Sequence, residues 1–128
     1  MIQPGQILIV DDEPSLLKMM SIYLRRLGYG VVTAITADEA MEAVRSQPGG
    51  FAVAVVDASL AGSGLDDLAS HMLQVTPRLC VIAASGYPVD MTVLEAAAPG
   101  RVVFLHKPFA PEMLAAAVRR MIATQEEV

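Results

Sequence analysis

Five short, almost uninterrupted apolar runs recur along the chain, and each is followed by a longer segment of mixed polarity. The runs are Ile7–Val10, Val31–Ala34, Ala52–Val56, Leu79–Ala84 and Val102–Leu105. Strands that are covered on both faces read this way, as in a parallel sheet. The alternation therefore predicts a (βα)5 chain, an α/β fold in which right-handed crossovers give a three-layer sandwich around a five-stranded parallel sheet.

The segments between the runs carry helix signals. The segment from Pro14 to Gly28 has apolar residues at helical spacing, a proline suited to the first turn and a glycine suited to the stop. The sequence "TADE", Thr36 to Glu39, has the form of a capping box and opens a second helix to about Ser46. Three further helices are predicted to include Leu68–Val75, Pro88–Ala98 and Pro111–Ile122.

Length and composition fit one compact domain over residues 1–128, with residues 125–128 as a short acidic tail. The chain is 54% hydrophobic, which is enough to bury a core. A net charge of −5 and the lack of a basic cluster argue against direct nucleic-acid binding. No apolar run is long enough to cross a membrane and no basic leader begins the chain, so we expect a cytoplasmic protein without a membrane partner. The single cysteine, Cys80, lies in an apolar run typical of core packing.

Polar residues follow four of the five predicted strands. Asp11 and Asp12 follow the first, Asp57 the third, Ser85 the fourth and Lys107 the fifth. In an open parallel sheet, ligands bind at the carboxyl ends of the strands. Three carboxylates in one cleft favour a divalent cation, and oxygen ligands point to Mg²⁺ or Mn²⁺. With a cation and a hydroxyl nearby, the cluster suits phosphoryl transfer, in which one carboxylate is free to be the nucleophile.

The acidic pair also has a simpler interpretation. Acids directly before Pro14 favour the positive end of a helix, and the other residues taken singly suit turns and strand exits. All of these simpler interpretations would have to coincide at one edge of one sheet, which favours a functional site.

Four motifs resemble the receiver domain of two-component response regulators, the CheY-like superfamily. They are "VDDE", "VVDASL", "AASG" and "LHKPF", in order after the first, third, fourth and fifth strands. The resemblance extends from Gln6 to about Thr124. It implies the flavodoxin-like strand order 2-1-3-4-5. It also implies a signalling phosphoacceptor in a two-component phosphorelay rather than an enzyme, with self-catalysed phosphoryl transfer and autodephosphorylation only.

The resemblance implies a role for each site residue. Asp57 would accept a phosphoryl group from a sensor histidine kinase or a histidine phosphotransfer protein. Asp12 would bind Mg²⁺ directly and Asp11 through water, with the Asp57 carboxylate and the Ser59 backbone carbonyl as further ligands. Lys107 would pair with the phosphoryl oxygens.

The resemblance also implies a conformational switch. Ser85 would hydrogen-bond the phosphoryl group, Phe104 would be the switch aromatic, and the Lys107-Pro108 bond would be cis. The surface from about Pro88 to Met121, formed by the last two helices and the fifth strand, would then control a downstream protein or form a homodimer.

The sequence departs from the family pattern after Asp57. In "DASLAGSGLDD", Ala61 stands where members commonly have proline, and Gly64 comes one residue early. Serine replaces the more frequent threonine at Ser85, and Phe104 has no hydroxyl. The chain is expected to be a stand-alone receiver or a receiver cut from a larger protein.

Two other functions compete with a phosphorylated receiver. A phosphohydrolase of the haloacid-dehalogenase type would use Asp11 as nucleophile, but it needs an acidic metal site after its lysine, and "PFAPEM" lacks one after Lys107. A degenerate receiver would bind partners without phosphorylation. The filled site positions count against it, whereas the altered loop keeps it open.

Overall fold

A computed structural model describes residues 5–60 and 64–126. Its strands are Gln6–Val10 (β1), Val31–Ala34 (β2), Phe51–Asp57 (β3), Cys80–Ser85 (β4) and Val102–His106 (β5). Its helices are Pro14–Arg26 (α1), Ala37–Ser46 (α2), Leu65–Val75 (α3), Thr92–Ala97 (α4) and Pro111–Glu126 (α5). All five predicted strands are present, each within one residue of the predicted bounds.

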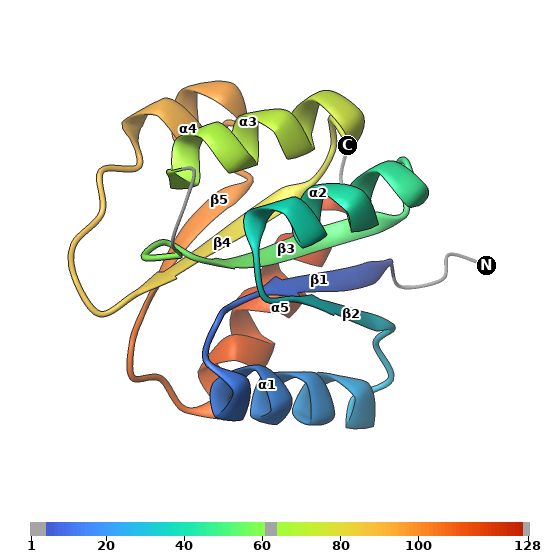
Figure 1. Cartoon of the computed structure of the whole chain (residues 1–128), viewed down its shortest axis with the longest axis vertical. Coiled ribbons are helices and arrows are strands. Elements are labelled where there is room, and N and C mark those ends of the chain that lie inside the picture. Colours follow the sequence, from blue (N-terminus) through green and yellow to red (C-terminus); the bar gives the residue numbers. More distant parts are fainter. Residues whose placement is uncertain (1–4, 61–63, 127–128) are drawn as a thin grey trace.

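The strands form one parallel sheet in the order β2-β1-β3-β4-β5. This is the predicted order 2-1-3-4-5, with β3 in the middle and β1 beside it (Figure 1). Helices α1 and α5 cover one face of the sheet, and α2, α3 and α4 cover the other. The prediction of a three-layer α/β sandwich is confirmed.

The two layers of core arise from the alternation of side chains along each strand. In β1, Ile7 and Ile9 pack under α1 and α5, whereas Leu8 and Val10 pack under α2 and its neighbours. All four side chains are fully buried. Because successive strand residues point to opposite faces, an apolar run is required wherever both faces are covered.

The predicted helix signals are found at the start and end of α1 and at the start of α2. Pro14 is the first residue of α1, and Gly28 follows its end with a φ of +100°, which glycine adopts readily. The Thr36 side chain accepts a hydrogen bond from the Glu39 N–H at 3.1 Å. The Glu39 carboxylate reaches back to the Ile35 N–H, also at 3.1 Å. Both side chains of the capping box therefore satisfy free backbone donors.

Two helix boundaries differ from the expected ones. The helix expected over Pro88–Ala98 is only Thr92–Ala97, because the Asp90 carboxylate accepts the Thr92 N–H at 2.9 Å and holds the preceding residues in a turn. Helix α5 continues to Glu126, so the first half of the segment expected as an acidic tail is helical; residues 127–128 lie outside the described residues. No helix among the described residues is long and apolar enough to cross a membrane.

Candidate functional site

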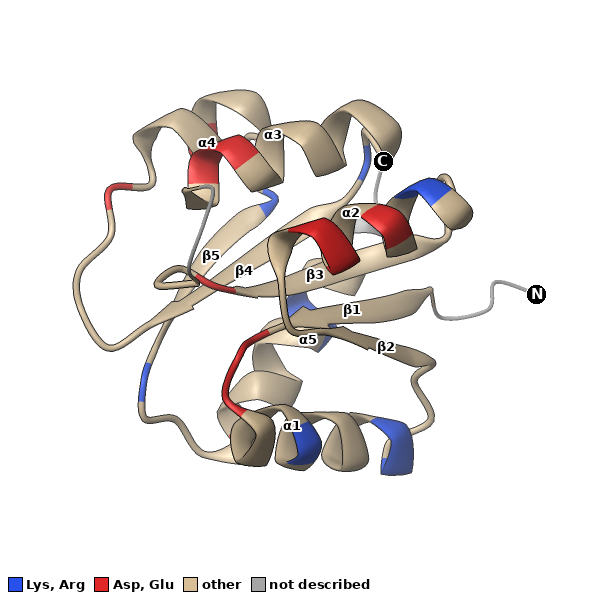
Figure 2. Ribbon diagram, in the orientation of Figure 1, with Lys and Arg blue, Asp and Glu red and all other residues tan. Residues whose placement is uncertain are grey.

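Three carboxylates meet at the carboxyl edge of the sheet. Asp11 directly follows β1, and Asp57 is the last residue of the neighbouring strand β3. Both are almost completely buried, at 2% and 5% exposure, whereas Asp12 is exposed. One oxygen from each of the three carboxylates lies within 4.8 Å of the others. Figure 2 shows the acidic segment after β1 facing the acidic end of β3.

Lys107, which directly follows the edge strand β5, lies against these carboxylates. The Lys107 ammonium donates to Asp11 Oδ2 at 2.9 Å and lies 3.5 Å from Asp57 Oδ2. Its backbone N–H donates to the Ser85 carbonyl at 2.8 Å, which ties the segment after β5 to the end of β4. One ammonium against three carboxylates leaves a formal charge of −2, the charge that a divalent cation balances.

Opposing effects act on the pKa of Lys107. Desolvation by burial lowers the pKa, but the hydrogen bond and charge of Asp11, together with Asp57, outweigh it and raise the pKa above its ordinary value. Lys107 therefore stays protonated at neutral pH while it lies between two buried carboxylates.

The two oxygens of Asp11 have separate partners. Oδ1 accepts the Glu13 N–H at 2.9 Å, just before α1 begins, and Oδ2 accepts from Lys107. The helix-start interpretation of the acidic pair and the site interpretation are thus both satisfied in one side chain. Neither excludes the other.

Ser59 holds the Asp57 carboxylate by its side chain as well as its backbone. Asp57 Oδ1 accepts the Ser59 N–H at 3.0 Å and the Ser59 hydroxyl at 2.8 Å. The sequence predicted a role for the Ser59 carbonyl only, so this contact of the hydroxyl is new. The signal available in the sequence was a serine two residues after an aspartate, a spacing at which such side chains bond locally. Oδ1 is consequently fixed by two donors while Oδ2 faces Lys107.

Ser85 and Phe104 lie on the two strands farthest from β1. Ser85 ends β4, is 4% exposed, and its hydroxyl oxygen accepts the Tyr87 N–H at 3.0 Å, which leaves the hydroxyl hydrogen free to donate. Phe104 is half-buried on β5, and its ring meets the His106 ring edge to face, with centroids 6.2 Å apart. The Lys107-Pro108 bond is cis, as the resemblance implied.

The segment after Asp57 is described only in part. Ala58 donates its N–H to the Ala84 carbonyl at 2.8 Å, which anchors the start of the segment to β4. Gly64 precedes the first residue of α3 and serves as its N-cap. Ala61, the predicted departure from the family pattern, lies outside the described residues, as do residues 62 and 63.

Residues 7–119 match the family model of the response regulator receiver domain. The chain belongs to this family. AlgB of Pseudomonas aeruginosa, an alginate biosynthesis transcriptional regulatory protein, is 32% identical over 123 residues; the match covers 95% of this chain and 27% of AlgB. KdpE of Mycobacterium tuberculosis, a transcriptional regulatory protein, is 33% identical over 125 residues, covering 94% of this chain and 54% of KdpE.

A solved structure shares the whole fold. The receiver domain protein (CheY-like) of Methanospirillum hungatei JF-1 superposes with a TM-score of 0.84 at 26% identity, covering 98% of each chain. A response regulator of Burkholderia pseudomallei, solved with a phosphorylated aspartic acid, a calcium ion and citrate, gives a TM-score of 0.75 at 25% identity, covering 97% of this chain and 73% of that one.

The family match decides against one of the two alternatives drawn from the sequence. The chain is a receiver domain of the two-component type, and the haloacid-dehalogenase alternative is not supported. The chain spans between about a quarter and about a half of the length of the curated relatives that it matches. The activities of those longer proteins therefore do not transfer as findings.

Proposed function

We propose that Asp57 is the phosphoacceptor of this receiver domain. The observation that carries the proposal is the position of its carboxylate, which is buried at the end of the central strand β3 beside both the Lys107 ammonium and the acidic pair. Asp11 is buried too, but it is bonded on one oxygen to the α1 start and on the other to Lys107. Of the two buried carboxylates, Asp57 is thus the one less occupied by contacts from other elements.

The chemistry proposed at Asp57 is the formation of an acyl phosphate. An oxygen of the carboxylate attacks the phosphorus of a phosphohistidine, an O–P bond forms, and the P–N bond breaks with its electron pair staying on the imidazole nitrogen of the donor. Lys107 lies where it can neutralise the phosphoryl oxygens. Ser59 holds Asp57 Oδ1 and so limits rotation of the carboxylate.

The donor set fits a divalent cation. The carboxylates of Asp11, Asp12 and Asp57 provide hard oxygen atoms close together, and the charge left after Lys107 is −2. We propose that these three, with the Ser59 carbonyl, hold Mg²⁺ or Mn²⁺. When bound, the ion neutralises part of the charge on the carboxylates and on the phosphoryl oxygens. The Burkholderia pseudomallei regulator, solved with both a phosphorylated aspartic acid and a calcium ion, supports this assignment.

The proposed output is a population shift that begins at Ser85. Its free hydroxyl hydrogen can donate to a phosphoryl oxygen, and its oxygen already accepts from Tyr87 in the segment before α4. Movement of Ser85 toward the site would therefore pull that segment and make room for Phe104 on β5. The face formed by α4, β5 and α5 is proposed to control a downstream protein or to form a homodimer. A sensor histidine kinase or a histidine phosphotransfer protein is the proposed donor.

Labelling with a small phosphodonor tests the proposal. We expect acetyl phosphate with Mg²⁺ to phosphorylate the wild-type chain, seen as a retarded band on a phosphate-affinity gel. Asp57→Asn should abolish the band, while Asp67→Asn, which changes an exposed aspartate on α3, should keep it. The amide is a poor nucleophile, and the substitution hardly changes volume.

The other outcomes are equally informative. A label that persists in Asp57→Asn would contradict the assignment of the acceptor. A folded wild-type chain that binds Mg²⁺ but takes no label from any small donor would instead favour the degenerate receiver.

A further inference from the structure

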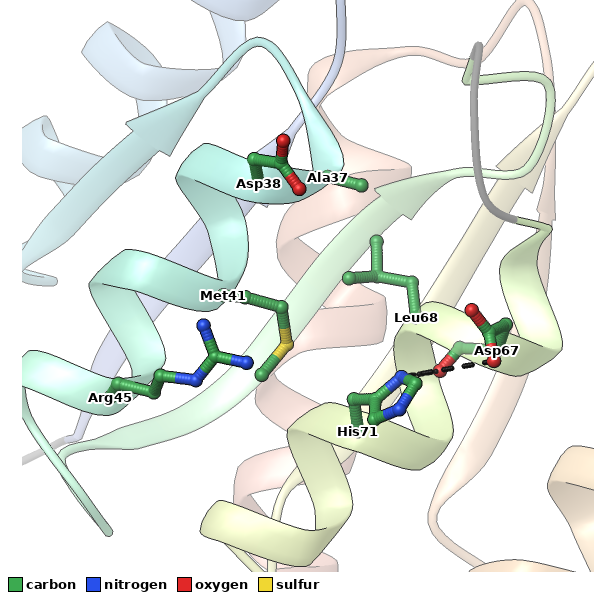
Figure 3. A pocket seen from close by; sticks show the side chains of 7 residues that line it. All are labelled: Ala37, Asp38, Met41, Arg45, Asp67, Leu68 and His71. Carbon is green, nitrogen blue, oxygen red and sulfur yellow. Dashed lines mark hydrogen bonds and ion pairs between the residues drawn. The ribbon is translucent and has the colours of Figure 1, made fainter.

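A cavity of about 200 Å³ lies between α2 and α3. Its apolar floor is formed by Met41 and Leu68, which are almost fully buried. Charged and polar side chains of both helices form its rim (Figure 3). No residue of the site described above lines it.

The rim has an acidic end and a basic end, because the two helices run in the same direction. Both α2 and α3 follow strands of one parallel sheet and return over the same face. Along α2, Asp38 comes first and Arg45 two turns later; along α3, Asp67 comes first and His71 one turn later. The acids therefore lie toward the beginning of both helices, and the bases lie farther along.

Helix dipoles alone favour such an arrangement, so the polarity by itself is not a site. The cavity provides the independent observation. In Figure 3 the Arg45 guanidinium and the His71 ring both point into the space between the helices, on either side of Met41. Within the described part of the chain, neither Arg45 nor Asp38 has an ion pair or a hydrogen bond from its side chain. Asp67 Oδ1 lies 3.8 Å from His71 Nδ1, so the charges available to a ligand are those of Asp38 at one end and Arg45 at the other.

His71 is already oriented by its own helix. Its Nδ1 donates to the Asp67 carbonyl at 2.8 Å, one turn earlier on α3, which fixes the ring and leaves Nε2 directed away from that bond. The three carboxylates of the phosphoacceptor site are the one cluster of potential metal ligands found among the described residues. The acids and the histidine of the cavity do not form such a cluster.

We infer that the α2–α3 cavity binds a small zwitterion whose ammonium and carboxylate are separated by an aliphatic stem, the chemistry of an ω-amino acid or of lysine. The ammonium pairs with Asp38, the stem lies on Met41 and Leu68, and the carboxylate pairs with Arg45. Seven residues separate Asp38 from Arg45, about 10 Å along the helix axis, a span that several methylenes can bridge as the side chains lean inward. The inference is independent of phosphorylation at Asp57.

Titration of the full chain with 6-aminohexanoate, followed by ¹H–¹⁵N NMR, tests the inference. We expect saturable shifts confined to α2 and α3, with a dissociation constant on the order of 1 mM because the rim is solvent-exposed. Hexylamine and hexanoate each lack one charge and should bind about fivefold more weakly. The inference would be overturned if the shifts caused by 6-aminohexanoate did not saturate, or if hexylamine bound as tightly as 6-aminohexanoate.

Substitutions on the rim provide the matched controls. Arg45→Gln and Asp38→Asn should each weaken 6-aminohexanoate binding by about fivefold or more, whereas Glu42→Gln, an exposed acid on α2 outside the cavity rim, should leave it unchanged. Because all three residues are exposed, the variants should fold. Unchanged binding in both rim variants would contradict the site.

A ligand of this kind could be a free amino acid or the C-terminal lysine of a protein, and the same NMR titration distinguishes the two. Free lysine and the peptide Gly-Gly-Lys both carry a carboxylate and a side-chain ammonium. Tighter binding of free lysine would identify a free amino acid as the ligand, and tighter binding of the peptide would identify the C-terminus of a protein. Binding of neither would overturn the extension from 6-aminohexanoate to lysine.

Discussion

The carboxyl edge of the sheet and the α2–α3 cavity use the same kinds of side chain in opposite ways. At the edge, Asp11 and Asp57 are buried and the Lys107 ammonium contacts both. At the cavity, Asp38 and Arg45 are exposed and lie two turns apart on one helix. One region holds its charges together at short distance, and the other leaves them open to solvent.

Burial explains the difference. A carboxylate taken out of water costs several kcal/mol unless a partner compensates it, so the buried acids at the edge require Lys107 or a metal ion. An exposed charge keeps its water and needs no partner. Charges at the edge should therefore affect stability as well as function, whereas charges at the cavity should affect only binding.

Replacing one basic side chain in each region should give the largest difference in stability between the two regions. Lys107→Met leaves two buried carboxylates uncompensated, and we expect it to lower the free energy of unfolding without Mg²⁺ by about 2 kcal/mol. Arg45→Gln should change it by less than about 0.5 kcal/mol. Urea denaturation measures both. Equal losses would show that burial does not distinguish the regions.

The difference in unfolding free energy between wild type and Lys107→Met should also depend on pH. The pKa of Lys107 is raised in the folded protein, so its stabilising contribution is fully present below the ordinary lysine value of 10.5. It is lost as pH rises through the higher folded-state pKa. As pH rises from neutral, the advantage of wild type over Lys107→Met should accordingly shrink only in strongly alkaline solution.

Ser85→Ala should have an intermediate effect. It removes the acceptor of the Tyr87 N–H and should cost about 1 kcal/mol. We expect NMR shift changes on α4, β5 and α5 upon phosphorylation to decrease more than the extent of phosphorylation does. Ser46→Ala, which removes an exposed hydroxyl bonded to the Ala43 carbonyl on α2, is the control for both measurements. Equal loss of labelling and of the shift changes would contradict the role of Ser85.

Asp12→Asn should have the smallest effect on stability. Removing an exposed like charge beside two acids should stabilise the metal-free protein slightly, by about 0.5 kcal/mol, while it reduces the stabilisation gained by adding Mg²⁺. Asp38→Asn, the matched change at the cavity, should leave the Mg²⁺ effect intact. Thermal unfolding with and without Mg²⁺ compares the two. An undiminished Mg²⁺ effect in Asp12→Asn would remove this residue from the proposed ligands.

The fold was predictable because a strand that is buried on both faces requires consecutive apolar residues. Val53 and Ala54 point to opposite faces of β3, yet both must be apolar, which produces the uninterrupted run. A parallel sheet then places every strand's carboxyl end at one edge. The gathering of Asp11, Asp57 and Lys107 follows from that topology, although they are separated by up to 96 positions.

Contacts that depend on side-chain torsions were not predictable in the same way. The Ser59 hydroxyl reaches Asp57 Oδ1 because of the local turn after β3, and many other rotamers would fit the same sequence. The short α4 is another case, since the bond from Thr92 to Asp90 competes with one further helical turn. The α2–α3 cavity required knowledge of how two parallel helices pack, which no single segment encodes.

The most direct test of the central claim is to locate the phosphoryl group itself. The protein is incubated with acetyl phosphate and Mg²⁺, the acyl phosphate is reduced with borohydride, and the reduced residue is located by mass spectrometry of peptides. We predict that position 57 is reduced to homoserine, with Asp11, Asp12 and the exposed Asp67 unchanged. Reduction at Asp11, or at any acid other than Asp57, would contradict the account.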